Sequence, residues 1–355
     1  MNLFAYIGSR TAREKNARGD GITVFKRDAK TGHLELVQVV DGLVNPSFLA
    51  INQANTRLYS VHGDMDYVSS FVINRDTGQL TFLNQQSCNG RNPVHLALDH
   101  SESFLVVSNY TTGNLAVLPL NEDGSLALIS QEIQLTGTPG PHRVEQVGPR
   151  PHSNPFDPSG RFVLIPDKGL DLILSYEFKD GQLTPSKGAN GFCRAASGPR
   201  HLSFHPSKPW VYVTNEIDST VATYVFDELT GGLAPFQITT SLSDSYTGNN
   251  TSAEIEISAK GDFLYVSNRG EDCISVFEVD QESGRINLIQ NQSTLGKTPR
   301  FFCLDPSGHF LYALNEESDN IVLFGVDQST GLLHPLEYKT SVGSPVCMIF
   351  GSSTA

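Results

Sequence analysis

Residues 298–315 read T-P-R-F-F-C-L-D-P-S-G-H-F-L-Y-A-L-N. A short apolar run follows Pro299, a turn of the type Asp-Pro-Ser-Gly lies at 305–308, and a second apolar run ends at Asn315. Short runs of aromatic and aliphatic residues bounded by such turns are typical of β-strands. The stretch therefore predicts two neighbouring strands joined by a tight turn.

The same pattern recurs along the chain. The residues Gly-Pro-Arg-His at 198–201 precede Val-Tyr-Val-Thr-Asn at 211–215, and another copy of the second run lies at 263–268. Aligned on the tyrosine of the second run or its equivalent, the copies fall at residues 6, 59, 106, 163, 212, 265 and 312. Seven copies about 50 residues apart indicate a repeat architecture. We therefore expect one domain over residues 1–355, although the length alone would suggest two.

Each repeat contains four short runs with strand character. In the sixth copy these lie at 253–257, 263–268, 273–279 and 285–289. Four strands in a unit of about 50 residues are typical of a β-propeller blade. The predicted fold class is therefore all-β: a seven-bladed β-propeller with four antiparallel strands per blade.

The two ends of the chain predict how the ring closes. The first copy begins at 3–8 with a run that matches a second strand, so its innermost strand is missing. The last run, at 343–350, matches an innermost strand with no strand after it. We expect the C-terminal strand to join the N-terminal blade and close the ring.

Composition and charge exclude several classes of protein. The formal net charge is −13, and the richest basic run, at 10–18, is interrupted by Glu14, so no nucleic-acid binding is expected. No apolar run approaches the roughly 18 residues of a membrane span, and residues 1–6 lack the features of a signal peptide. The five cysteines are scattered and odd in number, which favours free thiols in the cytoplasm. No zinc motif occurs, and the absence of G-x-S-x-G excludes an α/β-hydrolase serine. No metal and no cofactor are expected.

Two positions of the repeat emerge on the same face of such a ring. The residues that start the innermost strands are Ser47, Val94, His152, Arg200, Ala253, Arg300 and Val346. The residues that follow the second strands are Arg10, Gly63, Tyr110, Asp167, Glu216, Arg269 and Glu316. Arginines that face one channel form an anion site, and a glutamate with a histidine can supply a base and an acid. The alternative is that Arg200, Glu216 and Arg269 form only an ion-pair network between blades.

Three of these segments resemble a known family. Gly-Pro-Arg-His at 198–201, Thr-Asn-Glu at 214–216 and Pro-His-Ser at 151–153 are similar to motifs of the seven-bladed propeller lactonases. That family includes one type of 6-phosphogluconolactonase and the fungal 3-carboxy-cis,cis-muconate lactonizing enzyme. The resemblance implies a metal-free active site, whose four catalytic residues would be His152, Arg200, Glu216 and Arg269. Asn154-Pro155 departs from the usual family motif, because it interrupts the innermost strand that follows His152. His142 is therefore a second candidate for the catalytic histidine.

Further residues are candidates for binding the substrate. They are Arg300, His201, Asn215, His142 and Tyr110. His201 could instead pack between blades, and Asn215 could instead satisfy backbone groups of its loop.

The predicted reaction is hydrolysis of a small anionic lactone such as 6-phosphogluconolactone. Arg200 and Arg269 would bind the anionic group and stabilise the developing oxyanion. Glu216 would activate water and His152 would protonate the leaving alkoxide, or the two would exchange roles. Lactone formation by a carboxymuconate cycloisomerase is the first alternative, and a non-catalytic propeller that binds a protein partner is the second.

Overall fold

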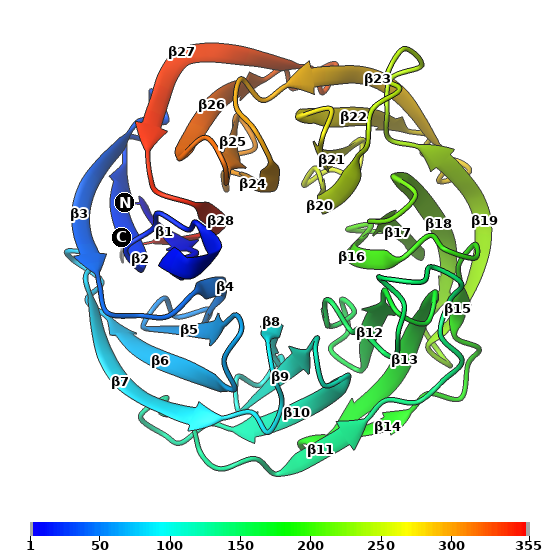
Figure 1. Ribbon diagram of the computed structural model, residues 1–355, viewed down its shortest axis with the longest axis horizontal. Coiled ribbons are helices and arrows are strands. Elements are labelled where there is room, and N and C mark those ends of the chain that lie inside the picture. Colours follow the sequence, from blue (N-terminus) through cyan, green and yellow to red (C-terminus); the bar gives the residue numbers. More distant parts are fainter. Residues whose placement is uncertain (1–2, 353–355) are drawn as a thin grey trace.

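The computed structural model describes residues 3–352 as seven four-stranded sheets set radially around one axis (Figure 1). All neighbouring strands within a sheet pair antiparallel. We number these sheets as blades one to seven in chain order. The predicted fold class is confirmed.

Six blades have a regular order of strands from the axis outward. Blade one holds β28 (Pro345–Ser352), β1 (Leu3–Ser9), β2 (Ile22–Arg27) and β3 (Leu34–Val40). Blade two holds β4 (Pro46–Ile51), β5 (Arg57–His62), β6 (Tyr67–Ile73) and β7 (Leu80–Ser87). Blade three holds β8 (Pro93–Leu98), β9 (Phe104–Asn109), β10 (Asn114–Pro119) and β11 (Gln131–Gln134). Blade five holds β16 (Pro199–Phe204), β17 (Trp210–Asn215), β18 (Thr220–Asp227) and β19 (Gly232–Thr240). Blade six holds β20 (Thr251–Ile257), β21 (Phe263–Arg269), β22 (Cys273–Val279) and β23 (Ile286–Ser293). Blade seven holds β24 (Pro299–Leu304), β25 (Phe310–Asn315), β26 (Asn320–Val326) and β27 (Leu333–Ser341).

Blade four departs from this order at its inner position. It contains β12 (Phe162–Asp167), β13 (Leu172–Lys179), β14 (Gln182–Pro185) and β15 (Gly191–Phe192), and the last two both pair with β13. The segment 151–156 lies beside β12 but makes only two isolated bridges, at Pro151 and Phe156. Pro151 and Pro155 lack the amide hydrogen that a strand ladder needs, so no regular inner strand forms here.

Within residues 3–352 the chain forms a single helix, the short 3₁₀ helix η1 (Arg13–Lys15). That part of the chain has no helix long and apolar enough to cross a bilayer.

The ends of the chain meet in blade one, as the sequence predicted. β28 pairs antiparallel with β1 from Leu3 opposite Ser352 to Ser9 opposite Pro345. The last described strand is therefore the innermost strand of the first blade and lies in the same sheet as the first described strand (Figure 1).

The core consists of seven apolar clusters, and a repeated tyrosine links neighbouring blades. The hydroxyl of Tyr212 donates to the carbonyl of Gly284, and that of Tyr265 donates to Gly331, each in the next blade. The buried Tyr312 of blade seven donates to Gly32 of blade one over 2.6 Å, so this contact spans the closure of the ring. In blades five, six and seven the tyrosine that marks the repeat in the sequence thus fastens one sheet to the next.

We expect Tyr312→Phe to lower the free energy of unfolding by about 1–2 kcal/mol. The variant loses the bond to Gly32 and also the hydroxyl that accepts from Arg27 Nε over 3.1 Å inside the core. Equilibrium urea unfolding measures the change. Tyr246→Phe is the matched control, because the Tyr246 hydroxyl donates only to Asn249 within a surface loop. Equal effects of the two substitutions would contradict the role given to Tyr312.

Candidate active site

A pocket of about 210 Å³ lies at the axis of the ring, with walls from six of the seven blades. Most of its lining comes from the two repeat positions singled out in the sequence. The predicted site residues that line it are Tyr110, His152, Arg200, His201, Glu216 and Arg300. Ring closure thus brings together side chains that are almost 200 residues apart in sequence.

β-Bulges aim two of the arginines at the axis. In β16 the register shifts between Pro199 and His201, which leaves Arg200 as the extra residue. β24 shifts in the same way around Arg300. A bulged residue is left out of the regular alternation of strand faces, so its side chain can be redirected. Both guanidinium groups line the pocket.

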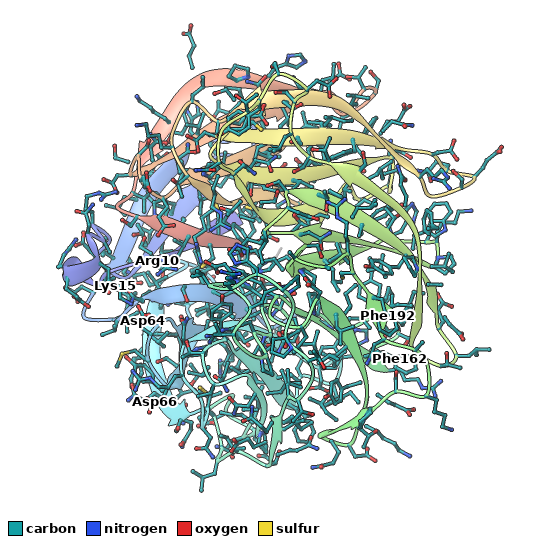
Figure 2. All side chains as sticks on the ribbon, turned by 45° about the vertical axis from the view of Figure 1, so that its right-hand side comes forward. Arg10, Lys15, Asp64, Asp66, Phe162 and Phe192 are labelled. Carbon is teal, nitrogen blue, oxygen red and sulfur yellow. The ribbon has the colours of Figure 1, made fainter. Side chains whose placement is uncertain are left out.

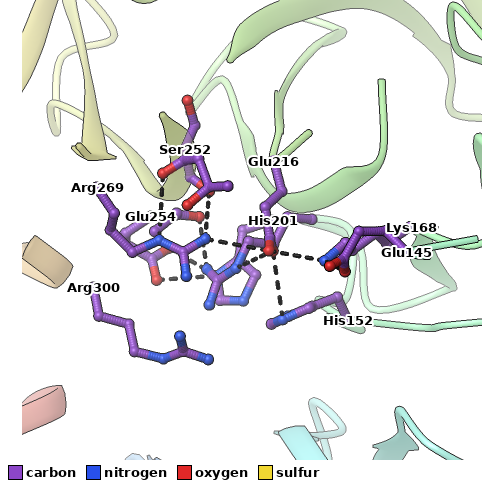
Figure 3. Close-up of polar contacts among 12 residues, drawn as sticks. Glu145, His152, Lys168, His201, Glu216, Ser252, Glu254, Arg269 and Arg300 are labelled. Carbon is purple, nitrogen blue, oxygen red and sulfur yellow. Dashed lines mark hydrogen bonds and ion pairs between the residues drawn. The ribbon is translucent and has the colours of Figure 1, made fainter. Parts of the chain in front are cut away.

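Glu216 is the centre of the polar cluster in this pocket (Figure 3). One carboxylate oxygen, Oε1, lies 2.9 Å from Lys168 Nζ and 3.3 Å from Arg269 Nη2. The other, Oε2, lies 3.1 Å from Arg200 Nε and 4.0 Å from His152 Nε2. One buried carboxylate thus faces three cations and an imidazole.

The surrounding charges decide the protonation of Glu216. Burial by itself would raise the pKa of Glu216, but attraction to Arg269, Lys168 and Arg200 outweighs burial and lowers that pKa well below the usual range. The carboxylate is therefore ionised at neutral pH and is a weak base. It is suited to holding the three cations in place.

His152 is uncharged in this environment. Burial lowers its pKa well below the usual value, and repulsion from Arg200 and His201 lowers it further. Its ring stands edge-on to Tyr110 at 5.5 Å and to His201 at 5.2 Å between centroids. Nδ1 of His152 is buried without a hydrogen-bond partner. The imidazole is thus a neutral group that can accept a proton.

Arg200 and Arg269 are anchored to the protein itself. Arg200 Nη1 donates to the carbonyl of Ala253 over 2.7 Å. Arg269 donates to the carbonyls of Thr251 and Ser252 over 3.3 and 3.0 Å, and it lies behind Glu216 outside the pocket lining. Burial, then repulsion from Arg269, lowers the pKa of Arg200 to about 9. The ion-pair network between blades that the sequence left as an alternative is therefore present, and it forms one wall of the pocket.

Two further charged residues belong to the site although they were not among the predicted site residues. Lys168 lines the pocket and bridges Glu216 to Glu145, whose Oε2 lies 2.7 Å from Lys168 Nζ. The sequence alignment placed Asp167 at this ring position, but Asp167 accepts hydrogen bonds from the backbone amides of Arg150, Gly169 and Leu170. Burial raises the pKa of Asp167 to about 7, although these bonds oppose the rise. The next residue, Lys168, is therefore the one that faces the axis.

The second addition is Arg10, which lines the pocket from the end of β1. Its Nε lies 3.0 Å from Glu316 Oε1, and Arg300 Nε approaches the other oxygen of Glu316 at 3.9 Å. Blades one and seven thus contribute a pair of arginines around one carboxylate.

Of three further residues predicted to bind the substrate, one lines the pocket and two do not. His201 lines the pocket, and its Nδ1 lies 3.0 Å from Glu254. Asn215 is fully buried outside the pocket lining, and its amide donates to Thr220 Oγ1 over 2.9 Å. His142 also lies outside the lining, and its Nδ1 accepts from the backbone amide of Glu145. Of the two candidate histidines, His152 is the one in the pocket.

Within residues 3–352 no group of three or more His, Cys, Asp and Glu side chains is arranged to hold a metal ion. The cations at the axis are those of lysine and arginine. Such a pocket can bind an anion, stabilise an oxyanion and move a proton through a neutral imidazole.

Comparison with known proteins gives consistent matches over nearly the whole chain. The family described as "Lactonase, 7-bladed beta-propeller" matches residues 4–350. A Bacillus subtilis (strain 168) protein named 6-phosphogluconolactonase is 37% identical over 304 residues, which cover 85% of each chain. A Formosa agariphila protein of the same name is 35% identical over 317 residues, covering 85% of this chain and 86% of that relative. The solved structure of the periplasmic gluconolactonase of Pseudomonas aeruginosa is 27% identical, has a TM-score of 0.91 and is matched over 100% of both chains.

Proposed function

The chain belongs to the seven-bladed β-propeller lactonase family and is a lactone hydrolase, and on that premise we propose that it hydrolyses an anionic sugar lactone without a metal ion. 6-Phosphogluconolactone is the substrate that we propose, because it is the one in the names of the two bacterial relatives. Ring opening would give the corresponding phosphorylated sugar acid.

The charge of the pocket is the observation that supports an anionic substrate most directly. The cluster combines five cationic side chains with three carboxylates: Arg10, Lys168, Arg200, Arg269 and Arg300, and Glu145, Glu216 and Glu316. Within these eight residues the cations exceed the carboxylates by two, although the chain as a whole carries −13. A phosphate group carries −1.5 to −2 at neutral pH, which matches this excess.

We assign the role of general base to His152. Its neutral imidazole would take a proton from water as the oxygen of that water adds to the lactone carbonyl. Arg200 and Lys168, which both line the pocket, would stabilise the resulting oxyanion. Collapse of the tetrahedral intermediate breaks the bond to the ring oxygen, and the protonated His152 returns its proton to that oxygen. The carboxylic acid of the product then ionises and releases a proton to the solvent.

Glu216 has a supporting role in this scheme. Three cations hold its carboxylate, and these ion pairs in turn hold Arg200 and Lys168 toward the pocket. The Nδ1 of His152, by contrast, has no hydrogen-bond partner among the described residues and is free to take a proton. The scheme therefore differs from both role assignments that the sequence left open, because His152 acts first as base and then as acid, and Glu216 does neither. Because arginine and lysine supply the positive charge, the scheme requires no metal.

We expect the purified protein to open 6-phosphogluconolactone with the same kcat and KM before and after dialysis against EDTA. The positive charge that acts on the oxyanion is part of the protein and cannot be removed by a chelator. Acid release at constant pH, corrected for spontaneous ring opening, measures the rate. Glucono-δ-lactone and 3-carboxy-cis,cis-muconate are tested in parallel. Loss of activity with EDTA would contradict metal independence, and turnover of the muconate alone would favour a cycloisomerase.

We also place this activity in the cytoplasm. All five cysteines are free thiols, and four of them are buried. Unpaired cysteines are typical of proteins kept in a reducing compartment.

A further inference from the structure

Two cations of the pocket are held much more loosely than the others. Arg200 and Arg269 each combine the ion pair to Glu216 with hydrogen bonds to backbone carbonyls. Arg300 has one ion-pair contact in the described chain, at 3.9 Å, and Arg10 has one at 3.0 Å, both with Glu316. In Figure 3 the guanidinium of Arg300 stands apart from the network around Glu216. Most donors of these two arginines therefore remain available to a ligand.

The two arginines also repel each other. The charge of Arg300, followed by burial, lowers the pKa of Arg10 to about 10, although Glu316 and Asp64 oppose this. Asp64 is itself paired with Lys15 over 2.7 Å. Figure 2 labels both residues next to Arg10. Among the described residues, Glu316 is thus the carboxylate that both guanidinium groups contact. A second anion between them would relieve the repulsion.

The position of this pair fixes the direction of a bound substrate. Arg10 and Arg300 come from blades one and seven, whereas His152, Lys168 and Glu216 come from blades four and five. These two groups of blades lie on opposite sides of the ring (Figure 1). A ligand that contacts both groups must therefore span the pocket.

We propose that Arg10 and Arg300 form the subsite for the phosphate group of the substrate, with the lactone carbonyl directed across the pocket to His152, Arg200 and Lys168. This inference rests on the proposed function and specifies the substrate class as phosphorylated lactones. It differs from the expectation drawn from the sequence, in which Arg200 and Arg269 bind the anionic group. Arg269 does not line the pocket, and Arg200 lies with His152 and Lys168 on the side of the lactone carbonyl, away from the phosphate.

The test compares two lactones that differ only in the phosphate. In Arg300→Gln and Arg10→Gln we expect kcat/KM for 6-phosphogluconolactone to fall about 100-fold, as for the loss of charge-assisted hydrogen bonds. For glucono-δ-lactone the decrease should be at least about ten times smaller, because that substrate has no group for the subsite. Arg300→Lys should recover part of the loss. Arg161→Gln is the matched control, since Arg161 pairs with Glu177 outside the pocket lining.

Inorganic phosphate provides a readout that does not require turnover. Its affinity for the wild-type protein, measured by titration calorimetry, should fall at least about tenfold in Arg300→Gln and stay unchanged in Arg161→Gln. Equal losses of kcat/KM for both lactones, or unchanged phosphate affinity, would overturn the subsite while leaving the lactonase proposal intact. A wild-type protein that opens neither lactone but binds phosphate through Arg10 and Arg300 would overturn the proposed function alone.

Discussion

Replacing His152 with glutamine should lower kcat for hydrolysis of 6-phosphogluconolactone by about 10³-fold, within the range contributed by general acid–base catalysis. Glutamine keeps a polar side chain of similar reach but cannot take the proton of the attacking water. KM should change much less, because the positive charges that bind the anion remain. Steady-state kinetics at neutral pH measure both constants. The matched control is His309→Gln, which changes an exposed histidine in a turn of blade seven.

The pH profile gives a second readout of the same role. A base must be unprotonated to act, and the pKa of His152 lies below its ordinary value of 6.5 because of burial and the nearby cations. Activity should therefore persist as the pH falls through 6.5 and decline only at more acidic pH. Glucono-δ-lactone is the substrate for this profile, since it has no titrating phosphate. Full activity of His152→Gln, or a decline centred above pH 6.5, would contradict the assignment.

Glu216→Gln should cost roughly 3 kcal/mol of the free energy of unfolding at pH 7, as expected when one partner of a buried ion pair is removed. The substitution leaves Lys168, Arg200 and Arg269 close together without the carboxylate that holds them. Urea unfolding measures the difference. Glu177→Gln is the control, because Glu177 forms a solvent-exposed pair with Arg161 that should contribute less than about 1 kcal/mol.

The effect of Glu216→Gln should depend on pH in a defined direction. The folded-state pKa of Glu216 lies below its ordinary value of 4.5, so the carboxylate stabilises the protein fully above that pH. This stabilisation is lost as the pH falls below 4.5 toward the lowered pKa. The difference in stability between wild type and variant should therefore shrink on acidification. A variant that loses activity but keeps wild-type stability at pH 7 would show that Glu216 acts in the chemistry instead.

The ring could be predicted from the sequence because its determinants repeat. Seven copies of the run, five of them with the tyrosine, and their Asp-Pro-Ser-Gly-like turns support one another, so a weak copy such as that around Val163 is identified by its spacing from the others. The missing inner strand of blade one predicted the closure by β28 for the same reason. Blade four was less regular than the repeat implied, because prolines at 151 and 155 remove donors that a strand requires.

The site was predicted less completely, because alignment of repeats fixes a position along a strand but not the direction of a side chain in a turn. Asp167 occupies the aligned position, yet it folds back onto backbone amides, and Lys168 faces the axis instead. Arg269 pairs with Glu216 but does not line the pocket, because its guanidinium donates to the carbonyls of Thr251 and Ser252. The repeat pattern does not indicate which carbonyls a side chain reaches. The sequence did hold one signal for Lys168: it directly follows Asp167, the residue at the aligned position.

The arrangement of blade one also constrains when the protein can complete its folding. Strand β1 (Leu3–Ser9) is synthesised more than 300 residues before its inner partner, β28 (Pro345–Ser352). Until β28 has been made, the inner edge of β1 has no partner, and an unpaired edge can associate with other chains. Arg10 follows that strand directly. The pocket therefore reaches its final form only after β28 has been made, and a product truncated before residue 345 would lack the inner edge that completes it.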